Sequence, residues 1–137
     1  MKLVVFTCLL AVVSFMAEGS TCIGKTVEVW VTNGIGLTGD GLADPDPYVL
    51  VQIDGKTQRT RVIHSNSNPG WWQTFRFYSP STNFMRIEVW EKDGGLRGDD
   101  DHLGTCVEDM VSQGNRFQHI QCTVKDGGVV KLLYKCT

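Results

Sequence analysis

The sequence predicts an all-β fold, an eight-stranded antiparallel β-sandwich, and three observations lead to this prediction. Apolar and polar residues alternate with a period of two in about eight short stretches, as expected for strands with one buried face. Turn-forming residues such as Asp54-Gly55 and Asn68-Pro69-Gly70 separate these stretches. No stretch has the period of a convincing amphipathic helix, so two packed sheets are the natural way to bury one face of each strand.

The first strand is expected from Lys25 onward, where Val27, Val29 and Val31 share one face. Each later strand is bounded by Gly, Pro, Asn or Asp residues. The seven later strands are expected at Tyr48–Ile53, Thr57–Ile63, Trp71–Phe77, Met85–Trp90, Leu103–Val107, Phe117–Cys122 and Val129–Tyr134.

Strand parity also sorts the aromatic residues. Trp71 and Phe75 share parity and are expected in the core. Trp30 and Trp72 have the opposite parity to their apolar neighbours. They form either an exposed aromatic patch on one sheet or a surface covered by the aliphatic stems of Arg or Lys side chains.

The N-terminus predicts secretion. A basic residue, Lys2, precedes the apolar run 3–16 and then the small residues Ala17 and Gly19, an order typical of a secretory signal peptide over residues 1–19. The run is too short to anchor a chain in a bilayer, and no second hydrophobic segment follows. We therefore expect a soluble extracellular protein in which residues 20–137, about 118 residues, form one domain.

Four cysteines remain after residue 19, and they predict disulfides rather than metal thiolates or a nucleophile. Their number is even, they contain no C-x-x-C pair, and the expected compartment is oxidising. We expect Cys106 to pair with Cys122, across a local excursion between two strands. Cys22 and Cys136, near the chain ends, form the second pair.

Eight of the 15 acidic residues gather in two short stretches between predicted strands. Carboxylates that converge at one end of a sandwich repel one another unless a cation neutralises them. Calcium takes about six to eight oxygen ligands, which such loops can supply, so the sequence predicts a Ca²⁺ site. For Asp44, Asp99 and Asp100 a solvated turn is an equally good interpretation. The eight residues are Asp40, Asp44, Asp46, Glu91, Asp93, Asp99, Asp100 and Asp101.

These loops resemble those of C2 domains, over residues 26–136. Within that family, residues 97–106 and 130–136 are most similar to the C2 domains of the perforins. Three motifs carry the resemblance: Asp40 with Asp46-Pro47-Tyr48-Val49, the strand entry Asn68-Pro69-Gly70-Trp71, and Trp90-Glu91-Lys92-Asp93 with Asp101-His102-Leu103-Gly104.

The resemblance implies a type II permutation of the sandwich, calcium binding and attachment to phospholipid membrane surfaces through that calcium. By its similarity to perforins it also implies a role in host defence. Glu91 stands where the family usually has Asp, and its carboxylate can still ligate. The implied calcium ligands are Asp40, Asp46, Asp93 and Asp101, with Glu91, Asp99 and Asp100 as further candidates.

The apolar residues Leu42 and Leu96 stand among Gly and Asp residues, where a core position is hard to arrange. We therefore expect both side chains to enter the lipid interface once calcium is bound.

Other functions are less well supported by the sequence. A net charge of −2 does not favour nucleic acid as a partner. Gly-x-Ser-x-Gly and His-Glu-x-x-His motifs are absent and the three His residues stand singly, so no enzyme is expected, although a calcium-assisted phospholipase is conceivable. The alternative function is a calcium-stabilised extracellular protein-binding domain, in which the ion only fixes the loops.

Overall fold

A computed structural model describes residues 19–39, 41, 43–93 and 99–137 of the chain. These residues form strands with antiparallel pairing and one short 3-10 turn. The elements are β1 (Thr26–Ile35), β2 (Pro47–Ile53), β3 (Lys56–Arg59), β4 (Gly70–Tyr78), β5 (Phe84–Glu91), β6 (Asp101–Asp109), β7 (Gln118–Thr123), η1 (Lys125–Gly127) and β8 (Val129–Cys136).

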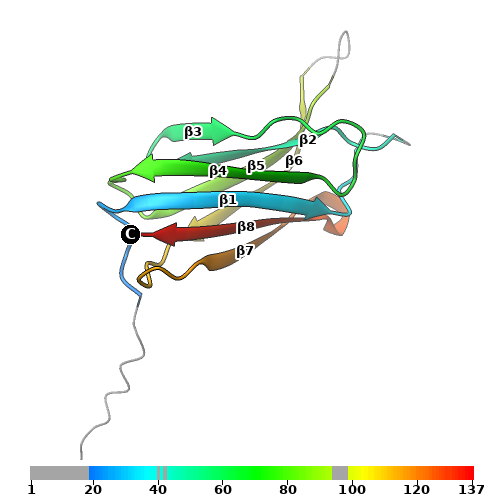
Figure 1. Cartoon of the computed structure of the whole chain (residues 1–137). Coiled ribbons are helices and arrows are strands. Elements are labelled where there is room, and N and C mark those ends of the chain that lie inside the picture. The colour runs from blue at the N-terminus through cyan, green and yellow to red at the C-terminus, as the bar shows by residue number, and fades with distance from the viewer. Residues whose placement is uncertain (1–18, 40, 42, 94–98) are drawn as a thin grey trace, which may run out of the picture.

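The eight strands form two four-stranded sheets that face each other (Figure 1). One sheet has the order β4-β1-β8-β7 and the other has the order β3-β2-β5-β6. The last strand, β8, lies inside its sheet between β1 and β7, which is the type II arrangement. The predicted eight-stranded antiparallel β-sandwich is therefore confirmed.

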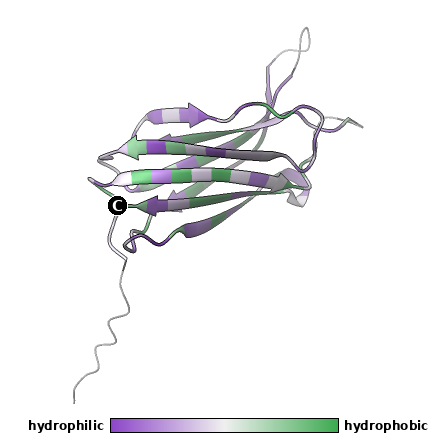
Figure 2. Ribbon diagram, in the orientation of Figure 1, coloured by the Kyte–Doolittle hydropathy of each residue, from purple (hydrophilic) through white to green (hydrophobic). Residues whose placement is uncertain are grey.

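The alternating pattern of each strand produces the core. Val27, Val29 and Val31 of β1 are fully buried, and the residues between them face outward. Figure 2 shows this alternation of hydrophobic and hydrophilic residues along β1. Trp71 is also fully buried, and its indole N–H donates to the Pro47 carbonyl at 3.3 Å, so the predicted core position of this tryptophan is correct.

The third strand is shorter than predicted. It ends at Arg59 rather than Ile63. The Thr60 N–H still donates to the Val49 carbonyl at 2.9 Å, but the bond in the other direction goes to a side chain. The Thr60 hydroxyl accepts from the Val49 N–H at 3.0 Å. The next N–H, of Arg61, donates to the Gln73 side chain at 2.7 Å. The Ile63 N–H donates to the Pro47 carbonyl at 3.1 Å, so residues 60–63 stay along β2 without forming a regular ladder.

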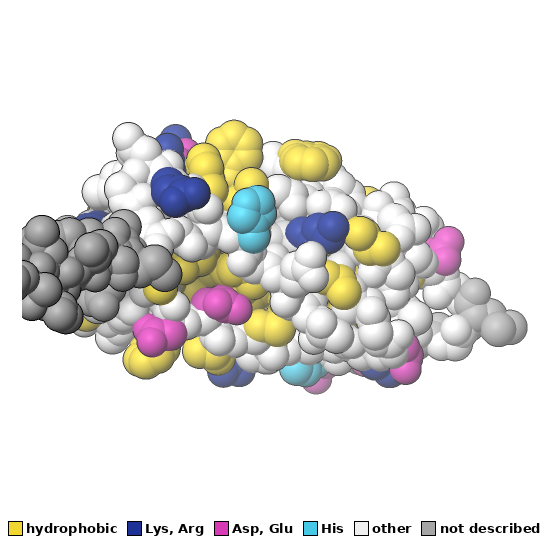
Figure 3. All heavy atoms as spheres, turned by 90° about the horizontal axis from the view of Figure 1, so that it is seen from below, with side chains coloured by type: hydrophobic (Ala, Val, Ile, Leu, Met, Phe, Trp, Pro, Cys, Tyr) yellow, Lys and Arg dark blue, Asp and Glu magenta, His cyan; other side chains and the backbone are white. Residues whose placement is uncertain are grey.

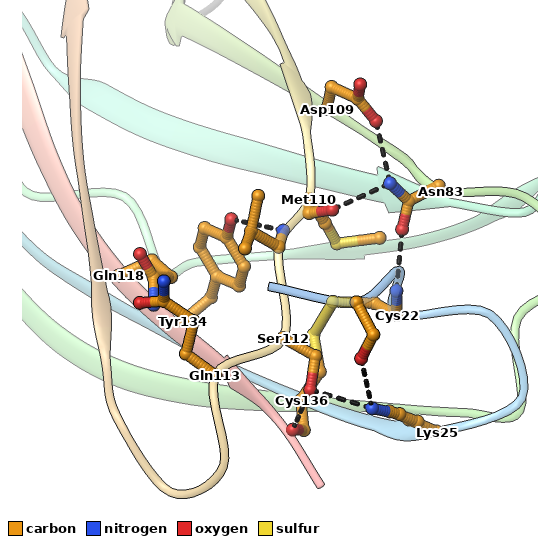
Figure 4. The surroundings of a disulfide bond; sticks show 12 residues. Cys22, Lys25, Asn83, Asp109, Met110, Ser112, Gln113, Gln118, Tyr134 and Cys136 are labelled. Carbon is orange, nitrogen blue, oxygen red and sulfur yellow. Dashed lines mark hydrogen bonds between the residues drawn. A yellow bond between two sulfur atoms is a disulfide. The ribbon is translucent and has the colours of Figure 1, made fainter. Parts of the chain in front are cut away.

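Two disulfides join parts of the sandwich that the sheets do not connect. Cys106 of β6 is bonded to Cys122 of β7, which links the two sheets. Cys22 is bonded to Cys136 at the end of β8 (Figure 4). Both pairs are those expected from the sequence.

The predicted signal peptide, residues 1–19, lies outside the described residues except for Gly19. Within the described ranges, no helix has the length and hydrophobicity needed to span a bilayer.

Candidate functional site

The described residues of three connections between strands lie at one end of the sandwich, on the right in Figure 1, and we call this end the loop end. Hydrogen bonds join the connections to one another. The Leu37 N–H donates to the Ser67 carbonyl at 2.8 Å, and the Lys92 N–H donates to the Asp46 carbonyl at 2.9 Å. The three connections are residues 36–46, 60–69 and 92–100.

Asp46 is the residue that touches both neighbouring connections. Its Oδ1 accepts a hydrogen bond from the Ser65 N–H at 2.6 Å, and His64 Nδ1 lies 3.9 Å from the same oxygen. The side chain keeps 31% of its surface exposed. The carboxylate is therefore oriented by the backbone of the 60–69 connection while it remains accessible to an ion.

Glu91, at the end of β5, is buried, with 8% of its surface exposed. Its Oε1 lies against Gly39: a Cβ atom added at that glycine would be only 2.6 Å from this oxygen. Glycine at position 39 thus leaves the space that the longer Glu side chain needs beneath the 36–46 connection. The family resemblance predicts Asp at position 91, and the close approach to Gly39 shows how this chain accommodates Glu instead.

The acidic residues Asp46, Glu91 and Asp101 come from the ends of three neighbouring strands. Pro47, which follows Asp46, is the register partner of Glu91, and Glu91 is the partner of Asp101. Adjacent strands lie about 4.8 Å apart, so this register places the three acids in one row across the ends of the strands. The prediction that the two acidic stretches meet at one end of the sandwich is supported by this register.

Asp100 turns toward the outer face of the sheet. Its Oδ2 accepts a hydrogen bond from the Tyr48 hydroxyl at 2.5 Å, and its Oδ1 accepts from the Asp93 N–H at 3.0 Å. The Tyr48 bond is the main reason why the pKa of Asp100 is lowered. Burial, and then the same bond, raise the pKa of Tyr48 to about 12. Lys92 Nζ lies 3.8 Å from Asp100 Oδ1, and its positive charge also lowers the pKa of Asp100.

A pocket of about 440 Å³ lies beside this pair on the outer face of the sheet. The Arg59 guanidinium stacks over the Tyr48 ring, 4.4 Å from its centroid. The Trp90 ring packs edge-on against His102, and its buried Nε1 has no hydrogen-bond partner among the described residues. The pocket is lined by Tyr48, Leu50, Trp90, Lys92, Asp93, Asp99 and Asp100.

The other predicted site residues are distributed differently. Asp99 is exposed, and Asp44 is exposed and accepts a hydrogen bond from the Ser67 hydroxyl at 3.1 Å. Asp40 and the two predicted lipid-contacting residues, Leu42 and Leu96, lie outside the described residues.

The chemistry of the available donors fits a hard cation such as calcium. Carboxylate oxygens of Asp46, Glu91, Asp93 and Asp101 would hold the ion, and the described cysteines are in disulfides, so soft thiolate ligands are not offered there. Among residues 19–39, 41, 43–93 and 99–137, however, no three His, Cys, Asp or Glu side chains are already arranged to hold a metal ion. The described carboxylates are thus gathered in a row but not closed around a common point.

Sequence reasoning missed the residues that orient the acids. Ser65 holds Asp46 through a backbone N–H, which no side-chain motif records. The Tyr48 hydroxyl holds Asp100, and Tyr48 is the register partner of Trp90. The alternating pattern places both aromatic side chains on the outer face of the sheet, and this was the sequence signal that could have indicated the contact. The close approach of Gly39 to Glu91 depends on tertiary packing, which no local pattern indicates.

Comparison with known proteins defines the class. The family model of the C2 domain matches residues 25–125, and the chain belongs to the C2 domain family.

Two relatives show where within that family the similarity lies. Perforin-1 of Rattus norvegicus is 32% identical over 103 residues, which cover 73% of this chain and 18% of the rat protein. The multiple C2 and transmembrane domain-containing protein 1 of Mus musculus is 31% identical over 98 residues, 70% of this chain and 9% of the mouse protein. The chain therefore spans less than a fifth of the length of either relative.

Solved structures agree on the fold. A C2 domain structure superposes with a TM-score of 0.72 and 26% identity, covering 82% of this chain and 98% of that one. A single C2 domain of plant extended synaptotagmin 1 superposes with a TM-score of 0.71 at 19% identity, covering 84% and 95% of the two chains, and this likeness concerns the fold alone.

Proposed function

We propose that this protein binds phospholipid membrane surfaces through calcium held at the loop end. The observation that carries the proposal is the row of acids at the ends of β2, β5 and β6, which consists of Asp46, Glu91 and Asp101. Membership of the C2 domain family supports it.

The electrostatics of the loop end give the proposal its physical basis. The 36–46 connection contains three Asp residues and no Lys or Arg. Without a cation, this end of the protein repels phosphate-bearing surfaces. Bound calcium would supply positive charge and, where protein oxygens leave coordination positions open, a direct contact for lipid phosphate oxygens. The protein's own part is to orient the carboxylates, as the Ser65 N–H does for Asp46.

The proposed setting is extracellular. The signal-like residues 1–19 and the two disulfides both favour an oxidising compartment. Calcium is millimolar outside cells, so an affinity typical of extracellular modules, with a Kd of about 10⁻⁴–10⁻³ M, is sufficient. The similarity to perforin-1 supports a role in host defence. We propose a binding role without catalysis, in keeping with the lack of esterase and metalloprotease motifs in the sequence.

Liposome sedimentation tests the proposal. The mature protein is centrifuged with vesicles of phosphatidylcholine and phosphatidylserine, in calcium and in chelator. We expect it to sediment with vesicles only in calcium. Asp46→Asn and Asp93→Asn should each reduce sedimentation at least tenfold, because Asn preserves the shape of Asp without its charge.

The matched control is Asp109→Asn, because this exposed acid lies at the opposite end of β6 and Asn can still accept the hydrogen bond from Asn83. This variant should sediment like the wild type. Membrane binding that persists in chelator, or in Asp46→Asn, would refute the calcium bridge. If calcium stabilises the protein without vesicle binding, the alternative of a calcium-stabilised protein-binding domain takes its place.

A further inference from the structure

Trp72 is the most exposed of the large hydrophobic residues in the described part of the chain, with 67% of its surface accessible. It lies on the outer face of the sheet β4-β1-β8-β7, in a β-bulge where the register between β1 and β4 shifts between Val31 and Asn33. Its φ of 49° lies in the left-handed region. The predicted outward position of this tryptophan is thus correct, and the conformation that presents it is unusual.

The folding of the sheet does not explain a tryptophan at this position. Bulky residues are genuine outliers in the left-handed region, whereas Asn and Gly adopt it readily. Because the Trp72 side chain remains mostly in water, its burial contributes little hydrophobic stabilisation to offset the cost of this backbone conformation. Strained residues of this kind concentrate at functional sites, where the rest of the fold holds them in place.

The surrounding residues hold Trp72 in a fixed orientation. Its indole lies over Gly70: a Cβ atom added there would be 2.8 Å from Trp72 Nε1. Arg61 donates from Nη2 to the Trp71 carbonyl at 2.6 Å, directly before the bulged residue. On the other side of the turn the Gly34 N–H donates to the Pro69 carbonyl at 2.8 Å. The tryptophan is therefore presented by a braced turn.

A pocket of about 320 Å³ lies beside the indole. Four of its lining residues come from paired positions on β7 and β8: His119 is the register partner of Leu133, and Gln121 is the partner of Lys131. Figure 3, a view onto the β7 side from below, shows large apolar side chains protruding beside Lys, Arg and His side chains. The lining residues are Thr32, Trp72, His119, Ile120, Gln121, Lys131, Leu132 and Leu133.

The polar groups of this rim are available to a ligand. Within the described part of the chain, the side chains of His119, Gln121 and Lys131 form no hydrogen bond or ion pair, and His119 and Gln121 are exposed. The lining contains no carboxylate, so a cationic ligand has no counter-charge there. One lysine suits a neutral or singly anionic ligand. The volume is at the lower end of the range for small-molecule sites, about 300–1,000 Å³.

From this geometry we propose that the Trp72 pocket is a carbohydrate-binding site, which takes a pyranose ring of a glycan. A pyranose has an apolar face of C–H groups that stacks on an exposed indole, and equatorial hydroxyls around its edge. Those hydroxyls meet His119, Gln121 and Lys131, which offer donors and acceptors. The site lies on the outer face of the sheet and uses none of the loop-end acids, so its binding is independent of calcium.

The test uses the mature protein in chelator, with four probes coupled separately to beads: mannose, galactose, N-acetylglucosamine and N-acetylneuraminic acid. We expect the wild type to be retained on at least one of them. Trp72→Asn should lose retention at least tenfold, because it removes the stacking surface. It should also melt at the same temperature as the wild type or higher, because Asn tolerates the backbone conformation. Gln121→Ala should bind more weakly than the wild type.

The matched control is Tyr78→Asn, which removes an exposed aromatic side chain from the same strand outside the pocket. It should be retained like the wild type. Absence of retention on all four probes overturns the proposal, as does full retention of Trp72→Asn or a clear fall in its melting temperature. If Trp72→Asn loses vesicle binding or self-association instead, while no sugar is retained, the surface serves a membrane or a second copy rather than a glycan.

Discussion

The two ends of the sandwich differ in how their polar groups are used. At the end that carries the Cys22–Cys136 disulfide, polar groups meet partners within the chain (Figure 4). The Cys22 N–H donates to Asn83 Oδ1 at 2.7 Å, Lys25 Nζ donates to Ser112 Oγ at 2.9 Å, and that hydroxyl donates to the Cys136 carbonyl at 2.9 Å. This end is a closed network around a covalent bond.

The loop end gathers like charges instead. Asp46, Glu91 and Asp101 lie in one row, and Asp93 and Asp100 belong to the connection between β5 and β6 at the same end. Like charges at close range cost stability, and a cation would reverse the sign of that interaction. The disulfide end is thus held together by a covalent bond and internal hydrogen bonds, whereas the loop end gathers carboxylates that a cation would neutralise.

The largest effect should come from breaking the disulfide end. Replacing both Cys22 and Cys136 by Ser frees a loop of 114 residues and should lower the free energy of unfolding by about 4–5 kcal/mol. Removing Cys106 and Cys122, which are only 16 residues apart, should cost less, about 3 kcal/mol. Urea unfolding measures both values. A larger loss for the second pair would contradict the assignment of stability to the first.

A smaller effect is expected from Gly39→Ala at the loop end. The new methyl group would stand 2.6 Å from Glu91 Oε1 and 3.1 Å from the Pro45 Cα, so the Glu91 side chain must move. Overpacking of this kind costs about 1–3 kcal/mol, and calcium affinity should fall as well.

The paired control for this prediction is Gly39→Ala combined with Glu91→Asp. The shorter side chain withdraws from the methyl group, so unfolding stability should recover most of its loss through coupling of the two positions. If the double variant is as unstable as the sum of the two single variants, Glu91 does not lie against Gly39.

The smallest effect concerns the Tyr48–Asp100 pair. The pKa of Tyr48 is raised to about 12, so the folded state holds this proton more tightly than the unfolded chain. Stability therefore falls as pH rises from about 10 toward 12. Asp100→Asn removes the charge but not the burial, so the Tyr48 pKa should fall only part of the way toward its ordinary value.

Absorbance at 295 nm follows this tyrosine titration. Tyr134 is the internal control, because its pKa is raised mainly by its own burial near Val111, far from Asp100. An unchanged high-pH titration in Asp100→Asn would show that the carboxylate does not hold the Tyr48 hydroxyl.

The fold was largely predictable from the sequence because burial of one strand face imposes a period of two. Val27, Val29 and Val31 show that period clearly and are fully buried. The prediction was wrong for the third strand beyond Arg59, where the Thr60 hydroxyl takes a ladder position. Alternation alone cannot distinguish a backbone hydrogen bond from a side-chain one.

The candidate site was predictable in its composition and less so in its geometry. The acidic stretches indicated Asp46, Glu91 and Asp101, and strand register places them in one row. The direction of each side chain depends on contacts between distant segments. Asp100 turns to Tyr48, which is 52 residues away in the chain, and no local pattern encodes that choice.

The most direct test of the calcium site at the loop end is a calorimetric titration of the mature protein with calcium at pH 7. We predict saturable binding with a Kd of about 10⁻⁴–10⁻³ M in the wild type and in the opposite-end control Asp109→Asn. In Asp46→Asn the binding should be lost or weakened at least tenfold. Calcium binding that is equally strong in Asp46→Asn, or undetectable in the wild type at millimolar calcium, would contradict the account.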